Sequence, residues 1–306
     1  MPPSQPWVGV GLRGPHIEPW LAQRPNVGFV EVHAENYFLP DGGARQWLQA
    51  VRQHHPVSLH AVGLGLGSAV GLDTEHLSQL ADLCQLIDPI RVSDHACFCR
   101  AQASGTAGPL TVHGTDLLPI AFTQASWHIM ARHIEQVQDT LQRPLLIENL
   151  SAYLRHADDA WEETDFLNQL CQHTGCQLLV DLNNLVVNAL NWSHPNGPAH
   201  EREAAAAQEA CAWADRIAPQ HVGQIHLAGH RPPQPQQLVV DDHSQPINPS
   251  VWTVYQHVLA HWGPRPTLVE WDVDLPPLDE LLAQTNTAAQ YLSCQTTPPS
   301  TNAKQP

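Results

Sequence analysis

Histidine and acidic residues stand at or beside the last position of six short apolar runs in this sequence. They are His60, His95, Glu148, Asp181, His226 and Glu270. Two further candidates, Asp241 and His243, follow in a D-x-H pattern beyond the seventh apolar run. Imidazole and carboxylate groups without a thiolate are typical ligands of iron, zinc or manganese. The residue types therefore predict a metal centre.

The candidate ligands are too many for a single ion. One catalytic metal with an open position needs about three or four protein ligands. This sequence offers the residues above and also Asn184, shortly beyond Asp181. A carboxylate such as Glu148 could bridge two ions, as paired-metal sites require. We therefore expect more than one ion.

Two simpler interpretations compete with a metal site. A single histidine at a strand end is more often a hydrogen-bonded structural group or a solvated side chain than a functional one. The whole set could also form an acid–base site without metal, in which buried groups shift one another's pKa values. So many ionisable groups would repel one another without cations between them, which favours the metal site.

Only a fold that gathers the ends of many strands can bring these residues together. Eight runs read as strands, at residues 8–12, 27–32, 56–61, 90–95, 144–149, 177–182, 222–227 and 266–271. Helix-like segments lie between them, for example at 73–87, 121–142 and 251–262. This alternation predicts a parallel sheet, and eight units predict a single (β/α)8 TIM barrel with its reactive groups at the carboxyl ends of the strands. A doubly wound sheet is the alternative, but no G-x-G-x-x-G motif follows the first strand.

Charge and cysteine content exclude several classes of protein. The chain has 14 lysines and arginines against 30 acidic residues, a net charge of −16, and so little from which to build a nucleic-acid-binding face. No apolar run is long enough to span a membrane, and the N-terminal residues lack a signal-peptide pattern. The seven cysteines are an odd number, as expected for reduced thiols. We expect a cytoplasmic protein that binds neither nucleic acid nor membrane.

The chain is expected to form one catalytic domain over residues 1–293. The following residues, 294–306, are polar and rich in proline, which predicts a disordered C-terminal tail. Two stretches, 100–118 and 188–198, read as long loops, and long loops at the strand-end face tend to carry function.

Several stretches around the candidate ligands form a recognisable set. They include GVGLRGPH (9–16), FVEVHAENYF (29–38), SLHAVGLGLGS (58–68), RVSDHACF (91–98), LLIENLSAY (145–153), QIHLAGH (224–230), VDDH (240–243) and PTLVEWD (266–272). With these stretches the sequence resembles the multinuclear non-heme iron-dependent oxidative enzymes (the MNIO family), which include the methanobactin-biosynthesis iron enzyme. The resemblance implies a barrel similar to xylose isomerase and endonuclease IV.

The resemblance also implies which residues bind metal. His60, His95 and Glu148 would hold one iron, and a second would be held by Glu148, Asp181, His226 and Glu270. Asn184, Asp241 and His243 would form a third and weaker site, because endonuclease IV has a histidine where this sequence has Asn184. Asp242 competes with Asp241 for this role, and the D-x-H pattern favours Asp241. Glu148, Asp181 and His226 would be the catalytic residues.

Members of this family oxidise cysteine in ribosomally made precursor peptides. The resemblance implies two or three irons, a mixed-valent Fe(II)/Fe(III) pair, dioxygen as co-substrate, and a small separate partner protein that presents the leader peptide. Two other functions stay open. One is a divalent-metal hydrolase or isomerase of the endonuclease IV or xylose isomerase type, and the other is a metal-binding protein without catalytic activity.

The remaining candidates surround the predicted centre. Arg13, His16, Glu35, Asn36, Tyr37 and His230 are expected either to contact substrate or to orient the metal ligands. His33 is expected to pack beside its strand. Cys97 and Cys99, just past His95, are interpreted as small buried side chains rather than redox groups.

Overall fold

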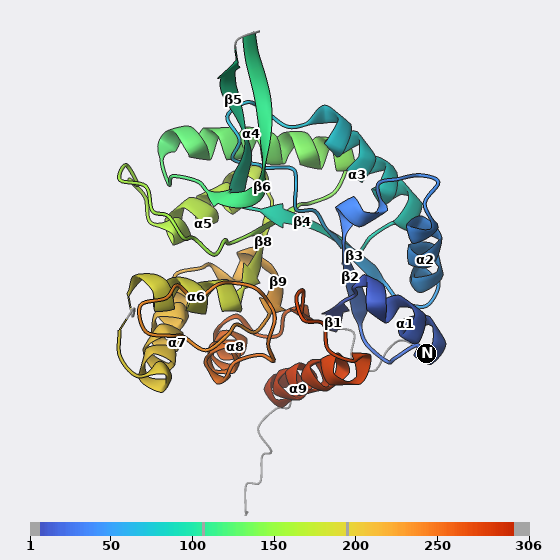
Figure 1. Cartoon of the computed structure of the whole chain (residues 1–306), viewed down its shortest axis with the longest axis vertical. Coiled ribbons are helices and arrows are strands. Elements are labelled where there is room, and N and C mark those ends of the chain that lie inside the picture. The colour runs from blue at the N-terminus through green and yellow to red at the C-terminus, as the bar shows by residue number, and fades with distance from the viewer. Residues whose placement is uncertain (1–6, 106–107, 194–195, 297–306) are drawn as a thin grey trace, which may run out of the picture.

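The fold is an eight-stranded parallel barrel. It is seen in a computed structural model that describes residues 7–105, 108–193 and 196–296 (Figure 1). Around the barrel the strands follow the order β1 (Val8–Gly11), β10 (Thr267–Val269), β9 (Val222–Leu227), β8 (Gln177–Asp181), β7 (Leu146–Glu148), β4 (Arg91–His95), β3 (Val57–His60) and β2 (Phe29–His33). Each predicted strand is present, and the predicted TIM barrel is confirmed.

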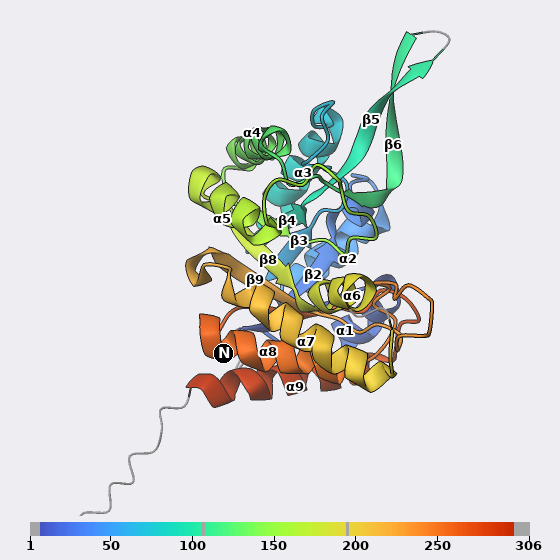
Figure 2. The same ribbon diagram turned by 90° about the vertical axis from the view of Figure 1, so that its left-hand side faces the viewer.

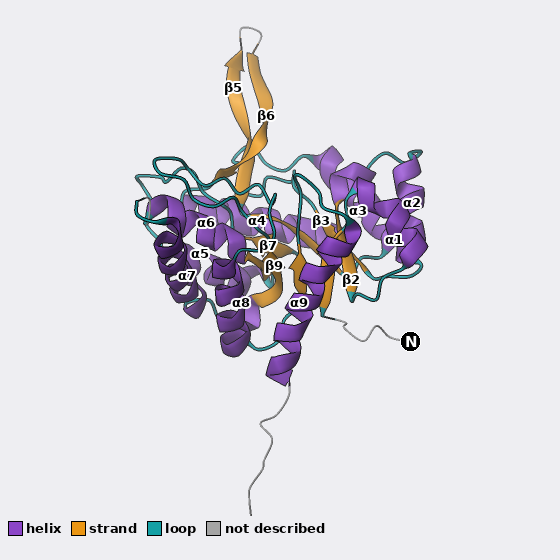
Figure 3. Ribbon diagram, turned by 60° about the horizontal axis from the view of Figure 1, so that its bottom comes forward, coloured by secondary structure: helices purple, strands orange, loops and turns teal. Residues whose placement is uncertain are grey.

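Helices cover the outside of the barrel (Figure 3). They are α1 (Ile17–Gln23), α2 (Gly43–Arg52), α3 (Thr74–Ile87), α4 (Gln124–Leu141), α5 (Glu163–Thr174), α6 (Leu182–Trp192), α7 (Ala199–Asp215), α8 (Pro249–Trp262) and α9 (Leu278–Thr296), with short 3-10 turns η1 (Gly14–His16), η2 (Ala34–Tyr37) and η3 (Pro219–His221). The three helices expected from the sequence correspond to α3, α4 and α8. Asp73 begins α3 as its cap, because its carboxylate accepts hydrogen bonds from the backbone of Glu75 and His76.

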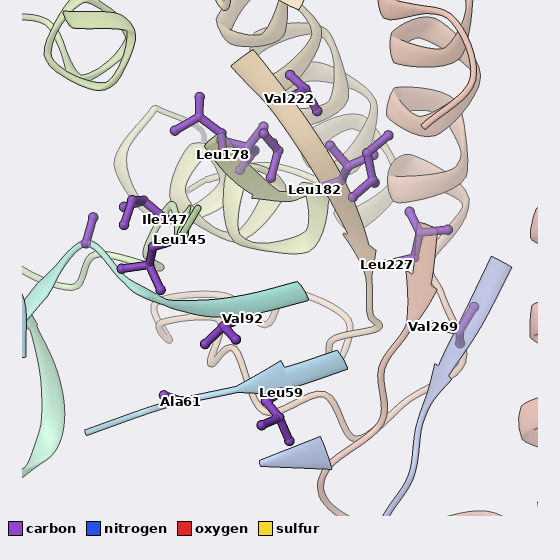
Figure 4. Packing of buried hydrophobic residues seen from close by; sticks show 14 of the residues in the cluster. Leu59, Ala61, Val92, Leu145, Ile147, Leu178, Leu182, Val222, Leu227 and Val269 are labelled. Carbon is purple, nitrogen blue, oxygen red and sulfur yellow. The ribbon is translucent and has the colours of Figure 1, made fainter. Parts of the chain in front are cut away.

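Strand alternation separates an apolar layer from the polar centre. Successive side chains on a strand point to opposite faces. On β3, Val57 and Leu59 therefore share one face while His60 points to the other, and Leu59 belongs to the buried cluster drawn in Figure 4. The same alternation on β9 separates Ile225 and Leu227 from His226. The pleat thus directs the last polar residue of each strand away from the apolar layer.

Two segments predicted as loops contain regular structure among their described residues. Within the stretch 100–118 the chain forms an antiparallel hairpin, β5 (Cys97–Gly105) and β6 (Gly108–Pro119), which projects away from the barrel (Figure 2). Pairing of the two strands satisfies backbone groups that a loop would leave to water. The stretch 188–198 begins inside α6, where the Asn188 side chain bonds to the backbone of Leu150 and Ala152. These tertiary contacts outweigh the low helix propensity of asparagine.

Helical structure continues slightly beyond the proposed domain boundary at residue 293. Helix α9 includes Cys294 and ends at Thr296, so the first three positions of the predicted tail are helical. The remaining positions of that tail, 297–306, lie outside the described residues. In the part of the chain that the structure describes, no helix combines the length and apolar character needed to cross a membrane.

Candidate metal centre

The candidate ligands from β3, β4 and β7 meet at the carboxyl end of the barrel. Nε2 of His60 and Nε2 of His95 lie 3.3 and 3.4 Å from Oε2 of Glu148. All three side chains are buried. The Ser93 hydroxyl lies 2.7 Å from Nδ1 of His60 and so fixes which ring nitrogen faces Glu148. Donor atoms around a tetrahedral ion with bonds of about 2.1 Å lie about 3.4 Å apart, so the spacing suits a bound cation.

A second group of donors overlaps the first. Glu148, Asp181 and His226 each offer one ligand atom, and these atoms lie within 4.8 Å of one another. Nδ1 of His226 is 3.0 Å from Oε2 of Glu270 and 3.8 Å from Oε1 of Glu148. Asp181, which ends β8, also caps α6 by accepting a hydrogen bond from the Asn184 backbone. Glu148 therefore belongs to two groups of possible ligands.

The excursion after β9 supplies a third group. Nε2 of His243 lies 2.8 Å from Oδ1 of Asp241 and 4.0 Å from Oδ2 of Asp181. Asp181, His243 and Glu270 again offer three atoms within 4.8 Å of one another. Asp242 instead accepts a hydrogen bond from Ser244 and lies 3.3 Å from Arg231, so of these two adjacent aspartates it is Asp241 that contacts His243.

The centre contains buried polar atoms that have no hydrogen-bond partner among the described residues. They are Oε2 of Glu148, Oδ2 of Asp181 and Oδ1 of Asn184. Burial raises the pKa of Glu148 well above its usual range and that of Asp181 to about 7. Buried oxygens without a hydrogen-bond partner, and carboxylates whose ionisation burial opposes, fit a centre that binds cations. Nitrogen and oxygen donors in overlapping groups fit more than one metal ion.

Glu31 contacts the centre but was not among the sequence candidates. Its Oε1 lies 2.9 Å from Nε2 of His226, and the Gln224 side chain donates to its other oxygen at 2.7 Å. Burial acts to raise the pKa of Glu31, but the facing His226 outweighs burial and the pKa falls to about 2. A hydrogen bond to Nε2 leaves Nδ1 of His226 directed at Glu148 and Glu270. An acidic residue within the apolar run FVEV was the available signal.

Arg13 and Asp272 hold Glu270 and His243 in place. The Arg13 guanidinium donates at 2.6 Å to both Glu270 and Asp272. Asp272, which the sequence reasoning also missed, lies 3.0 Å from Nδ1 of His243. His33 lies 3.1 Å from Arg13 and 3.7 Å from Glu270. It therefore contacts the centre, instead of only packing beside its strand as expected.

Four other candidates, His16, Glu35, Asn36 and Tyr37, lie outside the three donor groups. His16 bonds to the Pro276 carbonyl, and Glu35 accepts hydrogen bonds from the backbone of Val62 and Gly63. Tyr37 is buried in the core, and Asn36 is exposed.

His230 is linked to the metal centre through the side chain of one residue, Asn183. Its Nδ1 is 2.6 Å from Asn183, whose amide donates to Asp241 at 2.8 Å.

The two cysteines past His95 behave as buried thiols. Cys97 and Cys99 are buried at the base of the hairpin, and Sγ of Cys99 lies 3.4 Å from the ring of His113. Burial raises the pKa of Cys97 well above its usual range and that of Cys99 to about 11. Both thiols are therefore protonated near neutral pH.

The centre opens into a cavity of about 560 Å³. His60, His95, Glu148, His243 and Glu270 line it. Its lining also contains apolar side chains, among them Leu117, Leu118, Leu154, Val240 and Val273. Leu154, Val240 and Val273 are exposed. The cavity thus has exposed apolar side chains that a large substrate could contact.

Comparison with known proteins places the chain in a family. The model of the RiPP precursor modification enzyme family MbnB/TglH/ChrH matches residues 7–293, where RiPP denotes a ribosomally synthesised and post-translationally modified peptide. The chain belongs to this family, which confirms the resemblance found in its sequence. The family acts on RiPP precursor peptides.

Relatives and solved structures agree with this assignment. A UPF0276 protein of Vibrio parahaemolyticus is 38% identical over 301 residues, which cover 98% of this chain and 97% of the relative. A UPF0276 protein of Caulobacter vibrioides is 40% identical over 281 residues, 92% of both chains.

The barrel is similar to a xylose isomerase domain containing protein from Salmonella typhimurium (TM-score 0.58, 16% identity, 94% of this chain and 97% of that chain). It is also similar to endonuclease IV from Thermus thermophilus (TM-score 0.56, 15% identity, 94% and 98%). These matches confirm the expected type of barrel and concern the fold alone.

Proposed function

We propose that this protein is a multinuclear non-heme iron oxidoreductase that uses dioxygen to modify cysteine in a ribosomally made precursor peptide. The observation that carries the proposal is the overlap of the donor groups, which share Glu148, Asp181 and Glu270. Membership of a family of RiPP precursor modification enzymes supports the substrate class. Apolar side chains in the cavity lining, such as Leu118, Leu154 and Val240, suit a peptide better than a sugar.

The proposed ligand sets follow the donor groups. His60, His95 and Glu148 would hold one iron, and Glu148, Asp181, His226 and Glu270 would hold the second. Asn184, Asp241 and His243 would hold a third. Iron held by these residues would bind the substrate thiolate and supply the electrons that activate dioxygen.

The chain's own residues prepare the donors. Burial, with His95 beside it, lowers the pKa of His60, and burial lowers that of His95 to about 4, so both rings are neutral at pH 7 and present lone pairs. Glu31 and Ser93 fix ring orientation for His226 and His60. Glu148, Asp181 and His226 are the proposed catalytic residues, and the apolar side chains of the cavity lining would limit the access of water.

The proposed partners are a cysteine-containing precursor peptide and a small separate protein that presents its leader. The excess of acidic residues argues against a nucleic-acid substrate. We also propose that the reaction takes place in the cytoplasm, where the cysteines stay reduced.

Metal analysis and turnover test this function together. The protein is purified without oxygen, its metals are measured, and it is mixed with dioxygen and a cysteine-bearing peptide encoded beside its gene. We expect two or three irons per chain and a mass change on the peptide that disappears when its cysteine is replaced by serine. Bound zinc without iron, with activity indifferent to oxygen, would point to a hydrolase or isomerase. Iron without turnover of any such peptide would point to a metal-binding protein.

A further inference from the structure

A second cavity, of about 750 Å³, lies beside the metal cavity. Pro119, Leu150 and Leu154 line both cavities, so the loop after β7 separates them. The second cavity is enclosed by this loop, the beginning of α5, and residues of α6 and α7. Among the described residues that line it, none is a proposed metal ligand. We call it the tryptophan cavity, because Trp161, Trp192 and Trp213 contribute to its walls.

The aromatic walls suit a cation. The face of an indole ring attracts an ammonium or guanidinium group, and tryptophan does so best among the aromatic side chains. One wall already carries such a contact, since the Arg155 guanidinium lies 4.7 Å from the centre of the Trp192 ring. The wall thus accommodates a guanidinium geometrically.

Glu163 gives the cavity an acidic group without a matching cation. Its Oε2 accepts a hydrogen bond from Nε1 of Trp213 at 2.9 Å, and the described residues place no cation within 4.0 Å of it. The neighbouring Glu162 and Asp165 differ, because Arg216 lies 3.2 and 3.7 Å from them. Burial raises the pKa of Glu163 to about 7. Arg155 acts on this carboxylate only from beyond 4.0 Å, so a bound cation would find it without a salt bridge to the described residues.

We infer that the tryptophan cavity binds a guanidinium or ammonium group of the precursor peptide, some residues away from the cysteine at the metal centre. An extended peptide anchored at the centre reaches the neighbouring cavity by crossing the shared wall of Pro119, Leu150 and Leu154. Glu163 and the indole rings would then select arginine or lysine at one position of the substrate. The inference that the cation belongs to the precursor peptide rests on the proposed function, whereas the inference that the cavity binds a cation does not.

The first experiment measures cation binding alone, without turnover of a substrate. The protein is labelled with 5-fluorotryptophan and titrated with acetyl-arginine amide, acetyl-lysine amide and the neutral acetyl-citrulline amide, and ¹⁹F NMR signals are assigned by Trp→Phe variants. We expect the two cations, and not citrulline, to shift the signals of Trp161, Trp192 and Trp213. Glu163→Gln should weaken binding about tenfold, and Trp213→Phe should weaken it less. Glu280→Gln, an exposed carboxylate on α9, is the matched control and should change nothing.

Equal binding of arginine and citrulline amides, or unchanged binding in Glu163→Gln, would overturn the cation site. Trp213→Phe keeps this test decisive if Glu163→Gln fails to fold, because it removes one indole face and the hydrogen bond to Glu163 while keeping the carboxylate. The signals of Trp161 and Trp192 report the affinity of this variant for acetyl-arginine amide, and an unchanged affinity would overturn the site.

The link to the substrate is tested with synthetic peptides on the iron-loaded protein. Each peptide carries one cysteine and one arginine separated by about one to about eight glycines. We expect affinity to peak at one spacing, and to fall there when either cysteine becomes serine or arginine becomes citrulline. If arginine contributes but cysteine does not at any spacing, the cation site stands and the proposed function fails. If cysteine contributes but arginine does not, the inference fails and the proposed function stands.

Discussion

The two cavities on either side of the loop after β7 each contain a glutamate, and the two glutamates have different neighbours. In the metal cavity, Glu148 faces two imidazole nitrogens and keeps a buried oxygen without a hydrogen-bond partner. In the tryptophan cavity, Glu163 accepts a hydrogen bond from an indole. Lone-pair donors gathered around a carboxylate indicate a metal ion, whereas indole rings in the same cavity as a carboxylate suit an organic cation. The neighbours of a carboxylate, more than its burial, distinguish the two sites.

The largest effect should come from the carboxylate shared by two donor groups. Glu148→Ala removes a ligand from both proposed irons, and we expect turnover to fall about a thousandfold or more and iron content to drop. His226→Ala should act similarly through one iron. Metal analysis and peptide turnover measure both effects, with Glu280→Ala as the control. Full iron and activity in Glu148→Ala would disprove the bridging role.

Removal of metal should destabilise the barrel strongly. Bound ions stabilise only the folded chain, by about 4 kcal/mol when their concentration is about a thousand times the dissociation constant. For a chain of this size we expect chelation to lower the melting temperature by about 10 °C. Calorimetry before and after chelation, followed by reloading with Fe(II), checks this. An unchanged melting temperature would mean that the buried donors bind no ion.

Glu31 should affect metal affinity without being a ligand. Glu31→Gln weakens the hydrogen bond that directs Nδ1 of His226 into the centre, so we expect iron affinity to fall about 10- to 100-fold. Competition with a chelator gives the affinity, and the same measurement on Glu35→Gln, outside the cavity lining, serves as control. Equal losses in both variants would show that Glu31 acts only through general stability.

Two adjacent aspartates offer a finer comparison. Asp241 contacts His243, whereas Asp242 faces Arg231 and Ser244. We expect Asp241→Ala to remove about one ion per chain and Asp242→Ala to remove none. Asn184→Ala should remove at most that same ion. Metal counting by mass spectrometry decides, and loss of metal in Asp242→Ala but not in Asp241→Ala would reverse the assignment.

The smallest effect concerns pH and the tryptophan cavity. Burial raises the pKa of Glu163 from 4.5 to about 7, although the Trp213 hydrogen bond and Arg155 act to lower it. The folded chain therefore keeps a proton that the unfolded chain releases, and stability falls as the pH rises through this window. In Glu163→Gln the decrease in the free energy of unfolding between low and high pH should be smaller by about 1–2 kcal/mol. Urea unfolding at pH 4.5 and pH 8 measures it, and parallel curves for both proteins would contradict the assignment.

The sequence predicted the barrel because its strands are apolar, regularly spaced and separated by helical segments. It also predicted the strand-end candidates, since a polar residue closing an apolar strand is visible without a structure. The contact between Asp241 and His243 was read from the D-x-H pattern, and it depends on an excursion whose course no local propensity determines.

Other features depend on tertiary contacts that sequence patterns do not contain. Glu31 lies two positions before the end of its strand, and only the closed barrel brings it to His226. Asp272 meets His243 only because the excursion after β9 folds back over the centre. The sequence predicts loops at the hairpin β5–β6 and at the end of α6, because glycine and asparagine favour turns and the tertiary partners of these segments are not visible in the sequence.

Diffraction from iron-loaded crystals at wavelengths on both sides of the iron absorption edge would test the centre most directly. We predict two or three anomalous peaks, one between His60, His95 and Glu148 and another between Glu148, Asp181 and His226. Absence of iron peaks at these positions in protein that retains full activity would contradict the account.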